Sequence, residues 1–195
     1  MNMVYKWMSL ANLSSTKYRC GYCGEDIASN QGYYTETSHN LETGHIFICH
    51  HCTKPTFIDI SGNKTPGSSF GNIVEHIPNN EISELFDEAR RCISVNAYTA
   101  SILCSRKLLM NIAVSKGADI GLSFQKYVDY IASQGYVPPD GKAWVDHIRE
   151  KGNEATHEIQ MMKREDAQDL ITFIEMLLKF MYEFPAKMRE KQVKK

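Results

Sequence analysis

Two pairs of cysteines in the first third of the chain have the spacing of metal ligands. The four residues are Cys20, Cys23, Cys49 and Cys52, in the segments CGYCG and CHHC. A turn with two residues between the cysteines directs both thiolates at one point, so two such turns supply the four ligands of a tetrahedral zinc ion. Gly21 and Gly24 suit the first turn, because it needs backbone conformations that a Cβ atom resists. The spacing therefore predicts a structural Zn²⁺ site with a closed ligand shell, which offers no open position for catalysis.

Two other interpretations of these cysteines stay open. A redox CxxC motif needs only one pair beside a strand–helix–strand pattern, and the sequence has no such pattern around either pair. A histidine could also replace one cysteine as a zinc ligand, and the nearby candidates are His39, His45, His50 and His51. We favour four thiolates, since these already complete the tetrahedral shell.

A polar segment in the last third of the chain, WVDHIREKGNEATH at residues 144–157, holds a second set of candidate site residues. The set consists of Arg149, Asn153 and His157. The pattern favours a structural role, in which a helix ends near Gly152 and Asn153 caps the next helical turn. The charge of Arg149 then suits the end of the preceding helix, and His157 is partly buried one turn further on.

The residues around the cysteine pairs favour short β-strands. Segments 32–37, 45–49 and 56–60 are rich in aromatic or β-branched residues and are separated by turn residues. We therefore predict a zinc-ribbon-like domain over residues 1–60, with residues 1–15 as a leader segment. Residues 61–77 are expected to be a linker, because their first part is rich in Gly, Ser and Pro.

Beyond the linker, apolar residues recur at helical spacing. This periodicity predicts an all-α bundle of about five helices over residues 78–185. One helix is expected from Ser123 to Gly135, another from about Asp140 to Lys151, and the last is expected to end at Pro185. The fold class is thus mainly α, with a small β zinc ribbon before a helical bundle.

The remaining cysteines and the end of the chain are expected to be structurally ordinary. Cys92 and Cys104 lie among apolar neighbours on helix faces, so we expect them to behave as small buried hydrophobic residues. Residues 186–195 form a basic tail with five basic residues and one acidic residue. We expect this tail to be solvated and frayed.

The helical region resembles the domain-of-unknown-function family 4145, which is seen in prokaryotic proteins and on some type I restriction subunits. The similar pieces are DEARRCISVNAYTASILCSRKLLMNIAVSKGA (87–118), IASQGYVPP (131–139) and IREKGNEATHE (148–158). This family is grouped with the HEPN-like helical domains, many of which are dimeric. Some HEPN relatives are metal-independent ribonucleases that bring an Arg and a His together at a dimer cleft. The resemblance implies that Arg149 holds the phosphate and His157 moves the proton, with Asn153 as a polar helper.

The composition limits the classes of function. The 195 residues include 22 basic and 23 acidic side chains, so a formal net charge of −1 excludes a globally basic nucleic-acid coat. We see neither a signal peptide nor a run of about 18 apolar residues, and we expect a cytoplasmic protein with reduced thiols and no membrane contact. The sequence also shows no phosphate-binding loop, dinucleotide fingerprint, zinc-protease motif or nucleophile elbow.

These observations favour a non-catalytic zinc-binding interaction module that binds nucleic acid or a protein partner. The resemblance implies prokaryotic or phage defence and restriction systems as its setting. One alternative is a HEPN-like metal-independent ribonuclease that uses Arg149 and His157. The other is a scaffold in which the helical bundle only forms a homodimer.

Overall fold

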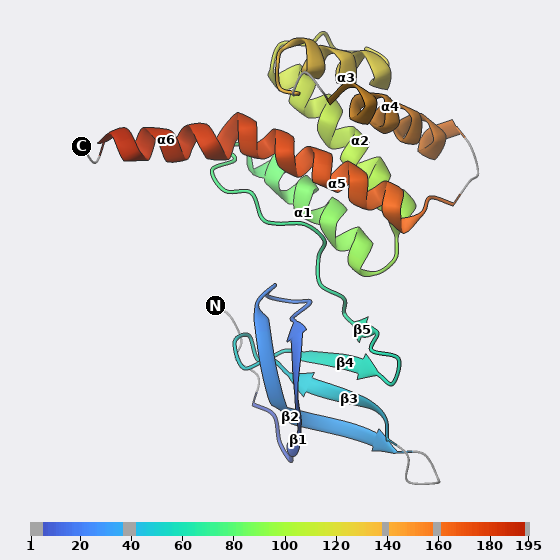
Figure 1. Cartoon of the computed structure of the whole chain (residues 1–195), viewed down its shortest axis with the longest axis vertical. Helices are drawn as coiled ribbons and strands as arrows, with labels where there is room; N and C mark the ends of the chain where they lie inside the picture. Colours follow the sequence, from blue (N-terminus) through green and yellow to red (C-terminus); the bar gives the residue numbers. More distant parts are fainter. Residues whose placement is uncertain (1–5, 37–41, 138–140, 158–160, 194–195) are drawn as a thin grey trace. The chain divides into compact units, whose positions relative to one another are not determined.

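An antiparallel β-sheet precedes a bundle of α-helices in the computed structural model of the chain (Figure 1). This order confirms the predicted fold class. The structure describes residues 6–36, 42–137, 141–157 and 161–193, apart from the side chains at 36, 42, 43, 142, 143, 152–157 and 193. The chain divides into two units, residues 1–69 and residues 70–195.

The first unit is a five-stranded sheet in which each strand pairs with the next one along the chain. Its strands are β1 (Ala11–Arg19), β2 (Asp26–Glu36), β3 (Glu42–Ile48), β4 (Pro55–Asp59) and β5 (Lys64–Thr65), and every pairing is antiparallel. The three predicted strands correspond to β2, β3 and β4. The structure adds β1, which begins inside the expected leader segment, and β5, which lies in the expected linker.

The two faces of the sheet differ, because successive side chains of a strand point to opposite sides. One face carries a small core, whose members are Tyr18, Cys20, Ile27, Phe47, Cys49 and Ile58. On the face opposite Phe47, the side chains of Tyr33, Ile46 and Phe57 are direct cross-strand neighbours on β2, β3 and β4. The core face therefore holds two of the four predicted ligands, and the other face carries a row of apolar side chains.

The second unit is a helical bundle built around α2. Its elements are α1 (Asn80–Ser94), α2 (Tyr98–Ser115), α3 (Phe124–Ser133), α4 (Lys142–His157), α5 (Arg164–Leu178), the π-helical turn η2 (Lys179–Glu183) and α6 (Phe184–Val193). Helix α2 packs against α1, α3, α4 and α5. The predicted start of the third helix is confirmed, because the Ser123 hydroxyl accepts a hydrogen bond from the Lys126 backbone N–H at 3.4 Å.

Two predicted helix ends are wrong. Helix α4 continues through Gly152 to His157, because a glycine inside a helix costs only about 1 kcal/mol and packing of α4 on α2 and α3 outweighs it. The last helix continues past Pro185 into α6. In η2 the Phe184 N–H bonds to the Lys179 carbonyl five residues earlier, and this wider turn makes room for a proline ring that would collide in a regular α-helix. Residues 186–193 are consequently helical and not a frayed tail.

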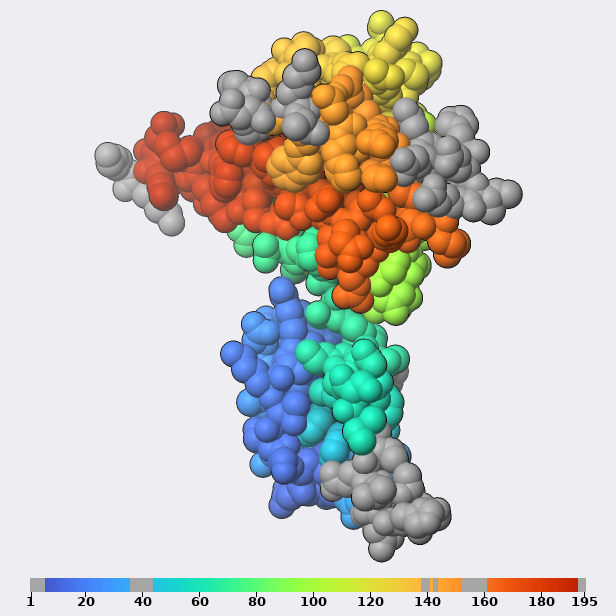
Figure 2. All heavy atoms as spheres, turned by 45° about the vertical axis from the view of Figure 1, so that its right-hand side comes forward, coloured from blue at the N-terminus to red at the C-terminus, as the bar shows by residue number. Residues whose placement is uncertain are grey.

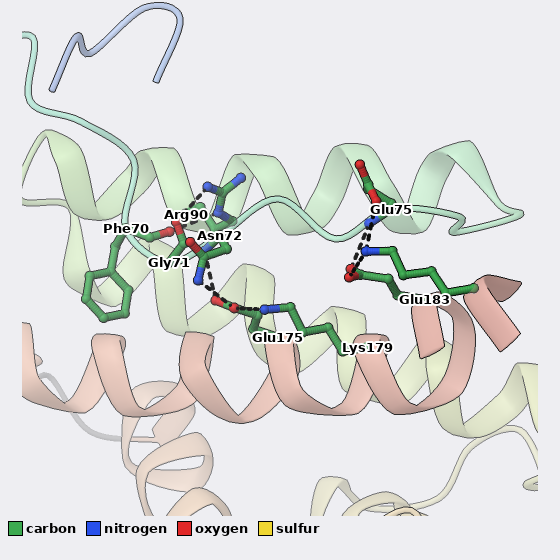
Figure 3. A network of polar contacts seen from close by, with 9 residues as sticks. Phe70, Gly71, Asn72, Glu75, Arg90, Glu175, Lys179 and Glu183 are labelled. Atoms are coloured by element: carbon green, nitrogen blue, oxygen red, sulfur yellow. Dashed lines mark hydrogen bonds and ion pairs between the residues drawn. The ribbon is translucent and has the colours of Figure 1, made fainter. Parts of the chain in front are cut away.

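A network of hydrogen bonds binds the start of the second unit to its helices (Figure 3). Arg90 on α1 is 4% exposed and donates from Nε to the Phe70 carbonyl and from Nη2 to the Gly71 carbonyl, both at 2.9 Å. Asn72 donates its backbone and side-chain N–H groups to the Glu175 carboxylate on α5, at 2.8 and 2.9 Å. This part of the expected linker is therefore held on the bundle.

The same segment continues along η2 and α6. The Glu75 N–H donates to the Glu183 carboxylate at 3.1 Å, and Lys187 bridges the Glu183 and Glu75 carboxylates at 2.7 and 3.1 Å. Between these anchors, Val74 is 5% exposed and belongs to the core of the bundle. Polar and apolar contacts thus hold residues 70–75, which lead into α1, against the bundle.

Candidate metal centre

The four predicted ligands converge at one point of the first unit. The Sγ atoms of Cys20 and Cys52 are 3.7 Å apart, those of Cys23 and Cys49 are 3.8 Å apart, and all four lie within 4.8 Å of one another. Four sulfur atoms held at about 2.3 Å from a tetrahedral zinc ion lie about 3.8 Å from each other. Two of the six Sγ–Sγ separations therefore match those of a tetrahedral zinc site, and the cluster is consistent with a zinc ribbon.

Each cysteine pair lies on a turn with the same hydrogen-bonding pattern. In the first turn, the Gly24 N–H bonds to the Cys20 carbonyl at 2.9 Å, and in the second the Thr53 N–H bonds to the Cys49 carbonyl at 2.8 Å. Backbone N–H groups also point at sulfur, from Tyr22 to Cys20 Sγ at 3.5 Å and from Cys52 to Cys49 Sγ at 3.4 Å. Such donors stabilise thiolates. The matching backbone hydrogen bonds make the two turns equivalent, and each turn contributes two cysteines to the cluster.

Positive φ angles at the residue after each pair close the two turns. Gly24 has φ +75°, as the sequence suggested, and Thr53 has φ +57° at the matching position of the second turn. Gly21 serves a different purpose, because a Cβ atom there would lie 2.4 Å from the Pro66 carbonyl oxygen. The sequence reasoning missed Thr53, although its place after the second CxxC, equivalent to that of Gly24 after the first, was a usable signal.

Burial favours the protonated thiol at Cys23 and Cys52 unless a cation is present. Burial raises the pKa of Cys23 to about 12 and also raises the pKa of Cys52. Burial opposes ionisation of Cys20 too, but the backbone N–H groups of Cys23 and Tyr22 bring the pKa of its thiol below the ordinary value. Four thiolates at this separation need a compensating positive charge, and a divalent ion supplies it.

Two aromatic side chains that the sequence did not single out support the cluster. Tyr18 is 2% exposed and packs on Phe47 with ring centroids 5.9 Å apart, and burial raises its pKa to about 12. The Trp7 indole donates to the Thr53 carbonyl of the second turn at 2.7 Å, and its ring lies 6.2 Å from that of Tyr33. Trp7 thus links the second turn to the sheet face that carries Tyr33.

The alternative ligands do not join the cluster within the part of the chain that the structure describes. There the only group of side chains able to hold a metal consists of the four cysteines. His50 and His51 are exposed, and His45 stacks on Phe47 with ring centroids 5.6 Å apart. His39 lies outside the described residues.

Cys92 and Cys104 are only partly buried, which differs from the expectation that they are core residues. Burial raises the pKa of both thiols, to about 11 for Cys104, and the neighbouring Glu88 carboxylate adds to the shift. Such thiols are weak nucleophiles at neutral pH.

The second set of candidate residues lies on α4. The Arg149 guanidinium is placed between two carboxylates: Nη1 donates to Asp129 on α3 at 2.7 Å, and Nη2 contacts Asp146 one turn earlier on α4. Helix α4 is continuous here, so Asn153 lies inside the helix and does not cap a new one. The side chains of Asn153 and His157 lie outside the described residues. Arg149 is therefore already neutralised by two acids, which compete with any phosphate.

Comparison with known proteins adds a family and no further match. The model of a family described as a domain of unknown function, DUF4145, matches residues 87–195. Neither the curated proteins nor the solved structures with which the chain was compared gave a match. Among the helices of the described residues, none has the length and apolar character needed to cross a bilayer.

Proposed function

Because the chain belongs to the DUF4145 family, whose description names no activity, we propose a function from the geometry of the cysteine cluster. We propose a non-catalytic interaction module whose N-terminal ribbon is folded by one structural zinc ion. The proposal rests on two Sγ–Sγ distances, 3.7 and 3.8 Å. These agree with the sulfur–sulfur distance of about 3.8 Å in a zinc site with four thiolate ligands. Cys20, Cys23, Cys49 and Cys52 would hold the ion.

Two features support a binding role over a catalytic one. Four thiolates fill a tetrahedral shell, so a zinc ion held by them keeps no position for water or substrate. Arg149, which a ribonuclease would use for phosphate, is 22% exposed and is engaged by Asp129 and Asp146. On this proposal the protein binds a partner and catalyses no reaction, and the metal ion stabilises a domain that is too small to depend on its hydrophobic core alone.

A protein partner fits the ribbon better than a nucleic acid. Residues 1–69 carry five basic and five acidic side chains, which gives no net positive charge to attract phosphates. The exposed feature of the sheet is instead apolar, with Tyr33 and Ile46 half-buried and Phe57 37% exposed. Aromatic side chains of this kind are enriched at protein interfaces. The setting we propose, prokaryotic or phage defence, rests on the family resemblance of the helical unit.

The test uses the zinc-loaded full chain with three readouts. These are the loss of intact mixed RNA without added divalent metal, the retention of RNA or DNA at increasing salt, and the capture of a protein from prokaryotic lysate. We expect intact RNA, no salt-dependent retention, and a captured protein that is lost with Phe57→Asp. The matched control is Ile60→Asp, because Ile60 is 81% exposed just beyond β4 and should keep the partner.

Two results would contradict the proposal. RNA cleavage that disappears in Arg149→Ala and in His157→Ala would establish the ribonuclease alternative. Nucleic-acid retention that falls steeply with salt would establish phosphate binding in place of a protein partner.

A further inference from the structure

The central helix of the second unit, α2, is open along one side. Helices α1, α3, α4 and α5 all pack on α2, and around it α1 packs on α5, α5 on α4, and α4 on α3. Figure 2 shows one covered face, where α4 and α5 (orange) lie in front of α2 (yellow-green). Among the described residues, α3 and α1 share no comparable packing, so the ring of helices around α2 is incomplete between them.

A line of exposed side chains on α2 marks this open side. Its members recur every four residues and are Leu103, Lys107, Asn111 and Ser115. Residues on the other sides of α2, such as Ile102 and Leu109, are fully buried. The helix at the centre of the bundle therefore keeps one side in contact with solvent, over a length of about 18 Å at 1.5 Å per residue.

A groove of about 560 Å³, which we call the α1–α2 groove, lies along this open side between α1 and α2. Its floor is apolar, because Ile82 and Leu108 are buried beneath it and Leu85 and Val114 are partly buried against the same core. Leu103 extends the apolar surface by one turn of α2 and is 42% exposed. An apolar floor between two helices is the kind of surface that receives the apolar face of a third helix.

The two walls of the α1–α2 groove differ in charge. The α1 wall carries Glu81, Glu84 and Glu88, which are exposed and, at steps of three and four residues, lie on one face of the helix. The α2 wall carries a single cation, Lys107. No described residue forms an ion pair with the three carboxylates of the α1 wall, whereas a lysine binds the Glu175 carboxylate on α5. The groove therefore presents uncompensated negative charge beside an apolar floor.

We propose that the α1–α2 groove binds one amphipathic helix of another protein, whose apolar face covers Leu85 and Leu103 and whose basic edge faces Glu81, Glu84 and Glu88. The acidic wall repels the phosphates of nucleic acids and of anionic lipids, so charge disfavours both as occupants. Lysine or arginine residues on one edge of a helix meet this wall over two successive turns. The proposal concerns the helical unit alone and does not depend on zinc or on the partner proposed for the ribbon.

The test measures the binding of two labelled peptides to the full, zinc-loaded chain by fluorescence anisotropy. The basic probe is a peptide of about 18 leucine and lysine residues with leucine at helical spacing, and the acidic probe has glutamate in place of lysine. We expect the basic probe to bind at least about tenfold more tightly than the acidic probe, because only its charges complement the α1 wall.

Two pairs of variants locate the bound probe. Glu84→Lys reverses the charge at the centre of the acidic wall and should weaken binding of the basic probe by about tenfold or more. Its matched control is Glu150→Lys, which makes the same change of net charge at an exposed residue of α4 and should change the affinity by less than about twofold. Leu103→Ser removes apolar contact and should weaken binding by about fivefold. Ile73→Ser is its control, because Ile73 is 69% exposed on the segment bound to α5 and should leave the affinity unchanged.

Several results would overturn the proposal. Equal affinities for the two probes would remove the role of charge, and an equal loss of binding in Glu150→Lys and Glu84→Lys would show a general attraction to the acidic chain. Loss of the basic probe in Phe57→Asp would place it on the ribbon, where our proposal expects unchanged binding. A chain mass of twice 22.2 kDa in light scattering that Glu84→Lys returns to 22.2 kDa would make a second copy the occupant. Circular dichroism at 222 nm checks that each variant keeps its helices.

Discussion

Arg90 is expected to be the most important polar side chain for the stability of the helical unit. It is 4% exposed, and its guanidinium binds the carbonyls of Phe70 and Gly71 (Figure 3). The guanidinium also binds the carboxylate of Asp87 at 2.7 Å. Its planar group also lies 5.5 Å from the centre of the Phe86 ring. Replacing Arg90 with Met keeps much of the apolar stem and removes every one of the polar contacts.

The expected loss of stability follows from these contacts. A hydrogen bond to a charged group contributes about 1.5–3 kcal/mol, and two carbonyls lose such a donor at once. Water reaches the partly exposed segment and recovers some of this, so we expect Arg90→Met to lower the free energy of unfolding by about 3 kcal/mol. At a typical dependence of about 2 kcal/mol per molar urea, the midpoint falls by about 1.5 M.

Urea unfolding of the full chain, followed by circular dichroism at 222 nm, measures this change because that signal reports the helices. The control is Arg91→Ala, an exposed neighbour that makes one hydrogen bond to the Asp87 carbonyl at 3.2 Å. Its midpoint should move by less than about 0.3 M, as for other surface changes. A midpoint for Arg90→Met within that same range would refute the reasoning that the buried guanidinium holds residues 70–75 on the bundle.

Three further outcomes are expected. Gly21→Ala should destabilise the ribbon by about 1–3 kcal/mol and speed zinc loss to a chelator, because its Cβ would meet the Pro66 carbonyl oxygen at 2.4 Å; unchanged zinc loss would count against it. The hydrogen bond from Lys187 lowers the pKa of the Glu183 carboxyl in the folded chain. The stability that the ionised carboxylate contributes is therefore complete above the pKa of an unfolded glutamate, about 4.3, and is lost as the pH falls through the lower pKa of the folded chain. Acid unfolding of Glu183→Gln should accordingly be less steep than that of the wild type, and an identical curve would argue otherwise. In a Trp144→Phe variant, removal of zinc should shift the fluorescence emission of Trp7 to longer wavelength, because the hydrogen bond from Trp7 to the Thr53 carbonyl is lost. An unchanged emission spectrum would show that the environment of Trp7 does not depend on the metal.

The parts of the fold that local sequence determines could be predicted. The four cysteines lie on two short turns whose geometry depends on a few adjacent residues, so their spacing alone predicted that the thiols converge. Strands β2 to β4 contain aromatic and β-branched runs that favour extended backbone. Strand β1 lacks such a run, and among its residues only Tyr18 is buried. Its place in the sheet depends on pairing with β2, which the composition of β1 does not reveal.

Features that depend on distant residues could not be predicted from local patterns. Gly152 and Pro185 are ordinary helix-ending residues, but packing on α2 and α3 overrides the first and a π-helical turn accommodates the second. The segment at residues 70–75 has the composition of a loop, and its attachment depends on Arg90 and on Glu175, 103 residues away from Asn72. The ion pairs of Arg149 likewise involve Asp129, 20 residues earlier on another helix.

X-ray absorption at the zinc edge, on the purified full chain, tests the metal-folded ribbon most directly. The geometry of Cys20, Cys23, Cys49 and Cys52 predicts one zinc ion per chain with four sulfur neighbours at about 2.3 Å and no nitrogen or oxygen neighbour. A nitrogen or oxygen atom in the first shell, or a folded ribbon that contains no zinc, would contradict a closed tetrathiolate centre.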